Sequence, residues 1–202
     1  MVTLREFIEM IAERAQAHPV FSDTDYLRYE RSAQDRHEFL DGSVYAMAGE
    51  SPSHSTICFN LYGSLYGQLR GKKCQGFSPN MKVATNEADL FSYPDLIIVC
   101  GQPMFRDKAS DVVTNPTIIF EVLSPSTESY DRGEKFLRYT NNIASLETYV
   151  LISQSSALVE VYSKRSGWQK EEFVGLDTTI TLDIVDCVLP LNELYERIGF
   201  PA

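Results

Sequence analysis

The sequence predicts an α/β or α+β fold built around one mixed β-sheet. Two observations predict it. Segments with apolar residues at helical spacing alternate with strand-like segments, and the run Leu96–Cys100 is apolar enough for a strand buried on both faces. The chain has 202 residues, 44% of them hydrophobic and 23% charged, as in ordinary globular proteins. We expect one domain over residues 1–202, with residues 1–20 as an N-terminal helical extension.

Helices and one hairpin are predicted in the first 70 residues. Ser22-Asp23-Thr24-Asp25 can cap a short helix, and Ser51-Pro52-Ser53 is typical of a helix start. Asp41-Gly42 suits a tight hairpin turn between two short strand-like segments. The expected elements are helices over 3–17, 22–27 and 51–70, and a hairpin over 37–47.

The remainder of the chain is predicted to be richer in strands. Ser124-Pro125-Ser126-Thr127 separates an apolar strand from a helix, and Ser166-Gly167 is typical of a turn between strands. The expected strands are 81–84, 93–100, 117–123, 147–153, 158–163, 169–174 and 179–185. The expected helices are 128–141 and a short last one around 191–195.

The charge balance bears on the class of partner. The chain has 18 Lys and Arg against 28 Asp and Glu, a net charge of −10. This argues against a protein whose whole surface attracts phosphate, so a nucleic-acid substrate would need a local basic strip or metal ions. Basic residues do gather locally, either as phosphate contacts or as ordinary solvated surface. They are Arg70, Lys72, Lys73, Lys82, Arg132, Lys135 and Arg138, and we expect the strand of Lys82 to lie beside that of Asp95.

The cysteines and the apolar runs bear on localisation. The four cysteines form no C-x-x-C pair, so we expect reduced, mostly buried thiols in a cytoplasmic protein. The N-terminal residues lack the pattern of a signal peptide. The longest apolar run is far too short to span a bilayer, so we expect no membrane partner.

Three carboxylates lie in or beside predicted strands where a plain core would exclude them: Glu38, Asp95 and Glu121. A buried carboxylate needs a cation, a metal or a proton. Two acids on neighbouring strands can hold a divalent cation, which serves phosphodiester hydrolysis. Simpler interpretations stay open. Asp95 can cap a turn, Glu121 can form a structural salt bridge, and Glu38 can face solvent.

A cation is needed beside such a pair to stabilise developing charge. Lys135 is the candidate, because Asp131, Lys135 and Tyr139 recur at helical spacing on one face. The alternative is an ordinary surface pair of Asp131 with Lys135. His54 opens a predicted helix and can contact substrate, carry a proton or simply cap the helix. Tyr139 can hydrogen-bond within the site or merely pack.

The ordered motifs resemble the Uma2 family, which is abundant in cyanobacteria and belongs to the PD-(D/E)xK restriction-endonuclease-like superfamily. The resemblance covers residues 20–197. It rests on Tyr93-Pro94-Asp95-Leu96-Ile97-Ile98-Val99, Phe120-Glu121-Val122-Leu123-Ser124-Pro125-Ser126-Thr127, Asp131, Lys135 and Tyr139, with His37-Glu38-Phe39-Leu40-Asp41-Gly42 and Ser51-Pro52-Ser53-His54 upstream. It implies a restriction-endonuclease-like core, a mixed central sheet flanked by helices, with extra C-terminal strands.

The resemblance also implies a function. Asp95 and Glu121 would hold Mg²⁺ or Mn²⁺, Glu38 would support them, and the substrate would be DNA. The superfamily's usual lysine position is occupied here by Leu123, so the lysine would come from the next helix as Lys135. His54 and Tyr139, together with Lys82 from the basic residues, are the candidate substrate contacts, and the chain would form a homodimer, as superfamily relatives often do. Two other functions stay open: a non-cleaving nucleic-acid or protein binding module, and a metal-dependent hydrolase of small phosphoesters.

Overall fold

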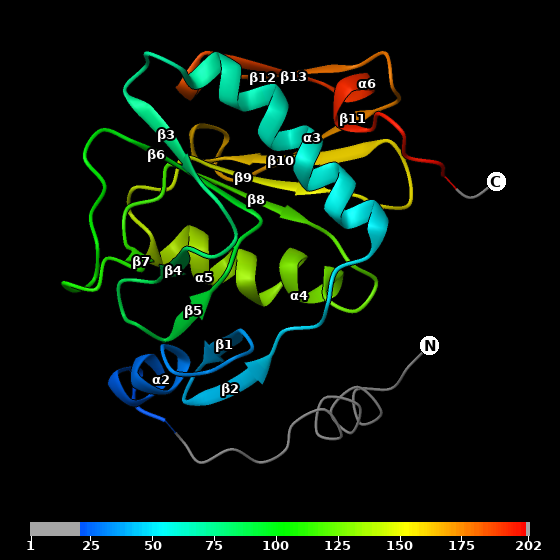
Figure 1. Ribbon diagram of the computed structural model, residues 1–202. Coiled ribbons are helices and arrows are strands. Elements are labelled where there is room, and N and C mark those ends of the chain that lie inside the picture. Colours follow the sequence, from blue (N-terminus) through cyan, green and yellow to red (C-terminus); the bar gives the residue numbers. More distant parts are fainter. Residues whose placement is uncertain (1–20, 201–202) are drawn as a thin grey trace.

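The computed structural model describes residues 21–200, so the helix predicted over 3–17 lies outside the described residues. A six-stranded mixed sheet forms the centre, in the order β11-β10-β9-β8-β6-β3 (Figure 1). Within it β6 and β8 are antiparallel, whereas β8 and β9 are parallel. Its strands are β3 (Cys74–Phe77), β6 (Leu96–Cys100), β8 (Ile118–Val122), β9 (Thr148–Ile152), β10 (Leu158–Ser163) and β11 (Lys170–Val174).

A second sheet of five short strands was not predicted. It has the order β2-β1-β5-β4-β7, and its strands are β1 (His37–Leu40), β2 (Ser43–Ala46), β4 (Lys82–Ala84), β5 (Leu90–Ser92) and β7 (Val112–Val113). The predicted hairpin is confirmed as β1 and β2, with Leu40 paired to Ser43 across the turn. A separate two-stranded ribbon pairs β12 (Thr179–Leu182) with β13 (Cys187–Pro190). Only β9 to β11 therefore extend the central sheet at its C-terminal side, and the strand predicted over 179–185 ends at Leu182.

Helices cover both faces of the central sheet (Figure 1). On one face lie α3 (Pro52–Leu69) and α6 (Leu191–Leu194), and on the other lie α4 (Glu128–Arg132) and α5 (Glu134–Asn142), whereas α2 (Asp23–Glu30) packs against the second sheet. The helices predicted over 22–27 and 51–70 are confirmed as α2 and α3, and the structure identifies Ser22 and Ser51 as their N-caps. The helix predicted over 128–141 is interrupted at Gly133, which separates α4 from α5. Among residues 21–200, no helix combines the length and hydropathy needed to cross a membrane.

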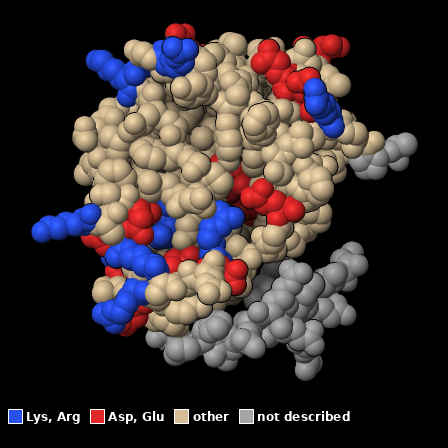
Figure 2. All heavy atoms as spheres, viewed as in Figure 1, with Lys and Arg blue, Asp and Glu red and all other residues tan. Residues whose placement is uncertain are grey.

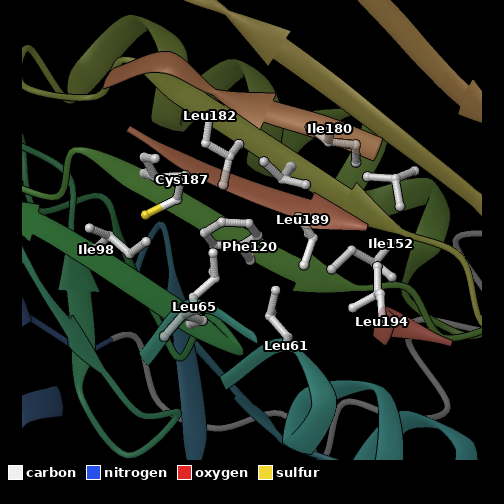
Figure 3. Close-up of a cluster of buried hydrophobic side chains, with 14 of the residues drawn as sticks. Leu61, Leu65, Ile98, Phe120, Ile152, Ile180, Leu182, Cys187, Leu189 and Leu194 are labelled. Carbon is white, nitrogen blue, oxygen red and sulfur yellow. The ribbon is translucent and has the colours of Figure 1, made fainter. Parts of the chain in front are cut away.

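Alternate residues of the central strands point into different cores. Ile98 and Phe120 pack with α3, α6 and the β12–β13 ribbon on one face (Figure 3). Ile97 and Ile119 pack on the opposite face, with α5 and part of the second sheet. Because side chains alternate along a strand, Glu121 lies on the same face as Ile119, toward α5.

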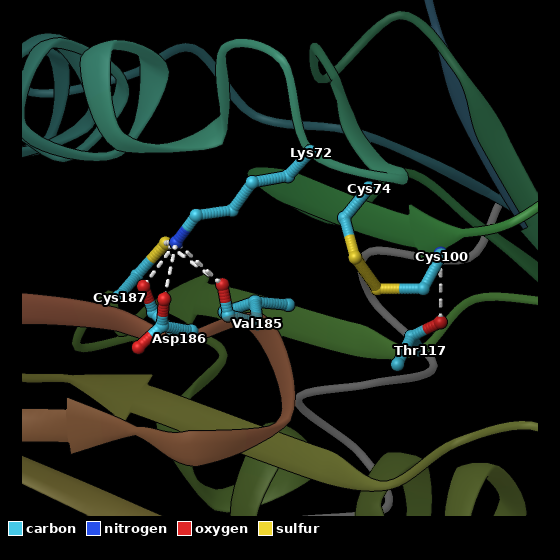
Figure 4. The surroundings of a disulfide bond; sticks show 7 residues. All are labelled: Lys72, Cys74, Cys100, Thr117, Val185, Asp186 and Cys187. Carbon is cyan, nitrogen blue, oxygen red and sulfur yellow. Dashed lines mark hydrogen bonds and ion pairs between the residues drawn. A yellow bond between two sulfur atoms is a disulfide. The ribbon is translucent and has the colours of Figure 1, made fainter.

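The cysteine prediction is wrong in part. Cys74 and Cys100 form a disulfide, because β3 and β6 pair antiparallel with these two residues directly opposite one another (Figure 4). That pairing depends on the register of two strands and not on a local spacing. Cys58 and Cys187 are free and buried, as expected.

Candidate active site

Asp95 and Glu121, two of the three predicted carboxylates, are held by neighbouring antiparallel strands. Leu96 of β6 pairs with Phe120 of β8, so Asp95, just before β6, lies at the same end of the strand pair as Glu121. Oδ2 of Asp95 accepts a hydrogen bond of 2.6 Å from the backbone N–H of Val122. Asp95 therefore does bind backbone, as a capping residue would, but it does so beside Glu121.

Lys135 lies at the centre of the carboxylates. Its Nζ is 3.1 Å from Oδ1 of Asp131, 3.2 Å from Oε1 of Glu121 and 3.3 Å from Oε1 of Glu38. The Lys135 side chain is only 6% exposed, so its pairing with Asp131 is not the surface pair that we kept as an alternative. Glu38 reaches this point from β1 of the second sheet, so the site lies where the two sheets and α5 meet.

Buried tyrosines line the same centre. The hydroxyl of Tyr139 donates to Oε1 of Glu121 at 3.4 Å and also contacts the hydroxyl of Ser92. The hydroxyl of Tyr149 donates to the backbone oxygen of Asp131 at 3.1 Å. Tyr139 therefore both packs and bonds within the cluster, and it fixes the orientation of the Glu121 carboxyl group.

The electrostatics of the cluster are those of a site short of positive charge. Burial raises the pKa of Glu121 well above its usual value, and although Lys135 opposes that rise, the neighbouring carboxylates add to it. Burial alone would lower the pKa of Lys135, but Asp131, Glu121 and Glu38 together hold it well above its usual value. Lys135 is thus a permanent cation, and one cation faces four carboxyl groups when Asp95 is included.

His54 approaches Asp95 from α3 on the other side. Its Nε2 lies 3.3 Å from Oδ2 of Asp95, and its Nδ1 lies 3.6 Å from Sγ of Cys58. Burial alone would lower the pKa of His54, but its contact with Asp95 and the nearby charge of Glu50 raise it. His54 therefore lies beside Asp95. The sequence predicted His54 as a substrate contact.

Lys82 lies elsewhere. It is on β4 of the second sheet, which does not pair with β6, so the prediction that its strand neighbours the Asp95 strand is wrong. Its Nζ contacts Asp111 at 3.0 Å and the hydroxyl of Tyr93 at 3.3 Å. It belongs to a separate buried polar cluster that continues from Tyr93 to Glu30 and His37.

The basic residues that gather along the sequence are largely paired with acids in the fold. Arg138 pairs with Asp41, Asp89 and Glu134, Arg132 pairs with Glu128 and Glu160, and Lys72 pairs with Asp186. Figure 2 shows the same mixture, with basic side chains lying beside acidic ones on the visible face. Positive charge for a polyanion would therefore have to come largely from a metal ion held at the site.

Sequence reasoning missed two members of the site. Asp131 was placed on the face of Lys135 but not in the site, although its oxygen is the nearest carboxylate contact of Lys135. Cys58 was not singled out, although His54 and Cys58 are four residues apart on one helix and so lie on one face. In both cases a spacing of four residues was the available signal.

The donor set fits a divalent cation. Carboxylate oxygens are the ligands that Mg²⁺ and Mn²⁺ prefer, and the cluster holds four carboxyl groups against one lysine. Within residues 21–200, Oδ1 of Asp95 and Oε2 of Glu121 receive no hydrogen bond, so each carboxyl group retains one oxygen that can bind a metal ion. A raised pKa at Glu121 means that this group needs a proton or a further cation, and a metal would supply the second.

The fold and this carboxylate–lysine cluster define a restriction-endonuclease-like protein. A crystal structure described as "a putative nuclease belonging to DUF820", from Anabaena variabilis, has the same fold, with a TM-score of 0.74 and 14% sequence identity over 89% of this chain and 99% of that chain. The family model of Uma2, described as "Putative restriction endonuclease", matches residues 23–192. The chain belongs to the Uma2 family.

Two curated relatives come from the cyanobacterium Synechocystis sp. The chain is 36% identical to the uncharacterised protein slr1290 over 194 residues, which is 95% of this chain and all of that protein. It is 32% identical to the uncharacterised protein sll1609 over 163 residues, which is 80% of this chain and 92% of that protein. The similarity therefore extends over nearly the whole length of both relatives.

Proposed function

We propose that the protein is a metal-dependent nuclease that hydrolyses DNA phosphodiester bonds. The observation that carries the proposal is the convergence of Glu38, Glu121 and Asp131 on the single lysine Lys135, with Asp95 beside them. A cluster with excess carboxylate and one fixed cation is suited to hold a divalent metal and a phosphate together. Membership of a family described as "Putative restriction endonuclease" supports the same reaction class.

Asp95 and Glu121 would hold Mg²⁺ or Mn²⁺, because each retains a carboxylate oxygen and both lie at one end of the β6–β8 pair. The metal, when bound, offsets charge on the phosphodiester and makes water a better nucleophile. Glu38 accepts from the backbone N–H of Tyr93 at 3.4 Å and positions the Lys135 ammonium group. Lys135 orients the attacking water or stabilises the charge that develops on the phosphate.

His54, which contacts Asp95, is the proposed proton carrier. Its ring is 12% exposed and its pKa is raised, so it can carry a proton near the reacting phosphate. Tyr139 is fully buried and bonded to Glu121, so it orients that carboxylate and does not reach substrate directly. Of the predicted substrate contacts, His54 thus acts as a proton carrier and Tyr139 as a positioning residue.

Cleavage of supercoiled plasmid tests the proposal. The wild type is expected to convert supercoiled DNA to open-circular or linear DNA with Mg²⁺ or Mn²⁺, and not with EDTA. Asp95→Asn is expected to lose both metal binding and cleavage, whereas Lys135→Met is expected to bind metal and lose turnover. Binding without cleavage by the wild type would favour the binding module. Cleavage of a small phosphoester but not of DNA would favour the phosphoester hydrolase.

A further inference from the structure

Three side chains of different chemistry meet beside the carboxylate cluster. His54, Cys58 and Asp95 each offer one ligand atom within 4.8 Å of the other two. Two of them lie on consecutive turns of α3, and the third precedes β6, so the helix and the sheet hold the group from opposite sides. Cys58 is 5% exposed, and the side chains of His54 and Asp95 are 12% and 13% exposed.

This set differs from the cluster around Lys135 in its donor atoms. Mg²⁺ and Mn²⁺ favour oxygen, whereas a thiolate sulfur together with an imidazole nitrogen favours Zn²⁺. Zn²⁺ is commonly held by three protein ligands of these types, with a fourth position for water. A further carboxylate is near, because Oε2 of Glu50 lies 3.7 Å from Nδ1 of His54.

We propose that His54, Cys58 and Asp95 form a Zn²⁺ site that inhibits the nuclease. The inhibitory part rests on the proposed function, because Asp95 is shared by the two sites. When Zn²⁺ is bound by His54, Cys58 and Asp95, the Asp95 carboxylate is no longer available to hold a catalytic metal together with Glu121. On binding, the thiol proton of Cys58 passes to solvent, so the step conserves charge and involves no redox change.

The sequence supports the assignment of Cys58. The chain has four cysteines, of which Cys74 and Cys100 form the disulfide, so Cys58 and Cys187 are the free thiols. Sγ of Cys187 lies 3.8 Å from Nζ of Lys72, where a nearby cation disfavours a metal ion (Figure 4). Cys187→Ser is therefore a matched control for Cys58→Ser, since it also removes one buried free thiol.

Cobalt absorption tests the site without reference to nuclease activity. Co²⁺ substitutes for Zn²⁺ and gives a thiolate charge-transfer band only when a cysteine sulfur binds it. We expect this band in the wild type and in Cys187→Ser, its loss in Cys58→Ser and Cys58→Ala, and its displacement by one equivalent of Zn²⁺. No band in the wild type, or a band retained in both Cys58 variants, would overturn the proposal.

A competition measurement then tests the shared carboxylate. One equivalent of Zn²⁺ is expected to abolish Mn²⁺ binding to the wild type and to Cys187→Ser, but to leave Mn²⁺ binding to Cys58→Ser unchanged. Equal Mn²⁺ binding by the wild type with and without Zn²⁺ would overturn the inhibitory role even where the cobalt band is present. If plasmid cleavage fails altogether while the cobalt band behaves as expected, the proposed function is wrong and the metal site stands.

Discussion

Nζ of Lys135 lies 3.2 Å from Oε1 of Glu121, although the two residues come from a helix and a strand that are separated by α4 in the chain. Both side chains are buried, at 6% and 7% exposure. Two further carboxylates contact the same ammonium group. Lys135 of α5 therefore contacts the carboxylates as the proposed function requires, and its replacement of the lysine absent at Leu123 stays a prediction.

Loss of Lys135 is expected to destabilise the protein in the absence of metal. Lys135→Met leaves Glu38, Glu121 and Asp131 without their cation, and breaking such a buried pair costs about 3 kcal/mol of unfolding free energy. Urea denaturation with EDTA measures the difference. The control is Lys164→Met, since Lys164 pairs with Glu147 in a half-exposed geometry and its loss costs less than about 1 kcal/mol. Equal losses in the two variants would contradict a central role for Lys135.

The break at Gly133 is expected to require glycine. A Cβ atom there would lie 2.9 Å from the backbone oxygen of Ser129, so Gly133→Ala must shift α4 or α5. We expect a loss of about 1–3 kcal/mol of unfolding free energy. Gly63→Ala is the comparison, because Gly63 lies in α3 with open space around it and alanine there gains about 0.5–1 kcal/mol. Thermal melts in which both variants have a higher melting temperature than the wild type would refute this explanation of the break.

The Cys74–Cys100 disulfide is expected to stabilise the fold under non-reducing conditions. The two cysteines are 26 residues apart, and closing a loop of this length contributes about 3 kcal/mol in the chain-entropy model. Dithiothreitol should therefore lower the melting temperature of the wild type and leave that of Cys100→Ser unchanged. A wild-type melting temperature that does not respond to reductant would show that the cysteines are not joined.

Acid is expected to remove the stabilisation that Asp111 provides. The hydrogen bond from Arg31, reinforced by Lys82, lowers the pKa of Asp111 to about 2. A carboxylate with a lowered pKa stabilises the fold above its unfolded pKa of about 4, and this contribution is lost as the pH falls toward 2. The difference in unfolding free energy between the wild type and Asp111→Asn should thus shrink from pH 5 to pH 2. A difference that stays constant over this range would contradict the assignment.

Much of the fold and part of the site followed from the sequence. The apolar runs that flank Asp95 and Glu121 predicted two neighbouring strands, and a spacing of four residues placed Lys135 beside Asp131. The strand predicted over 81–84 is β4, but the second sheet was missed because β5 and β7 have only two or three residues each, too few to show a period. Lys82 was misplaced because β4 pairs with β5 and β7 and not with β6, a long-range pairing with no local sequence signal.

Long-range pairings were the other limit. The Cys74–Cys100 disulfide depends on strand register, and the approach of Glu38 to Lys135 depends on how the two sheets meet. Neither relation has a local sequence signal. The homodimer stays a prediction, which sedimentation velocity measures directly. The roles of Lys82 in substrate binding and of His54 in proton transfer also stay predictions.

Calorimetric titration with Mn²⁺ tests the central claim most directly, on the wild type and on Glu121→Gln. The variant preserves the shape of the side chain and removes its charge, and Lys135 keeps its contacts with Glu38 and Asp131. The account predicts that the wild type binds Mn²⁺ and that Glu121→Gln does not. No binding by the wild type, or equal binding by both proteins, would contradict it and make the carboxylate–lysine cluster a structural feature of the fold.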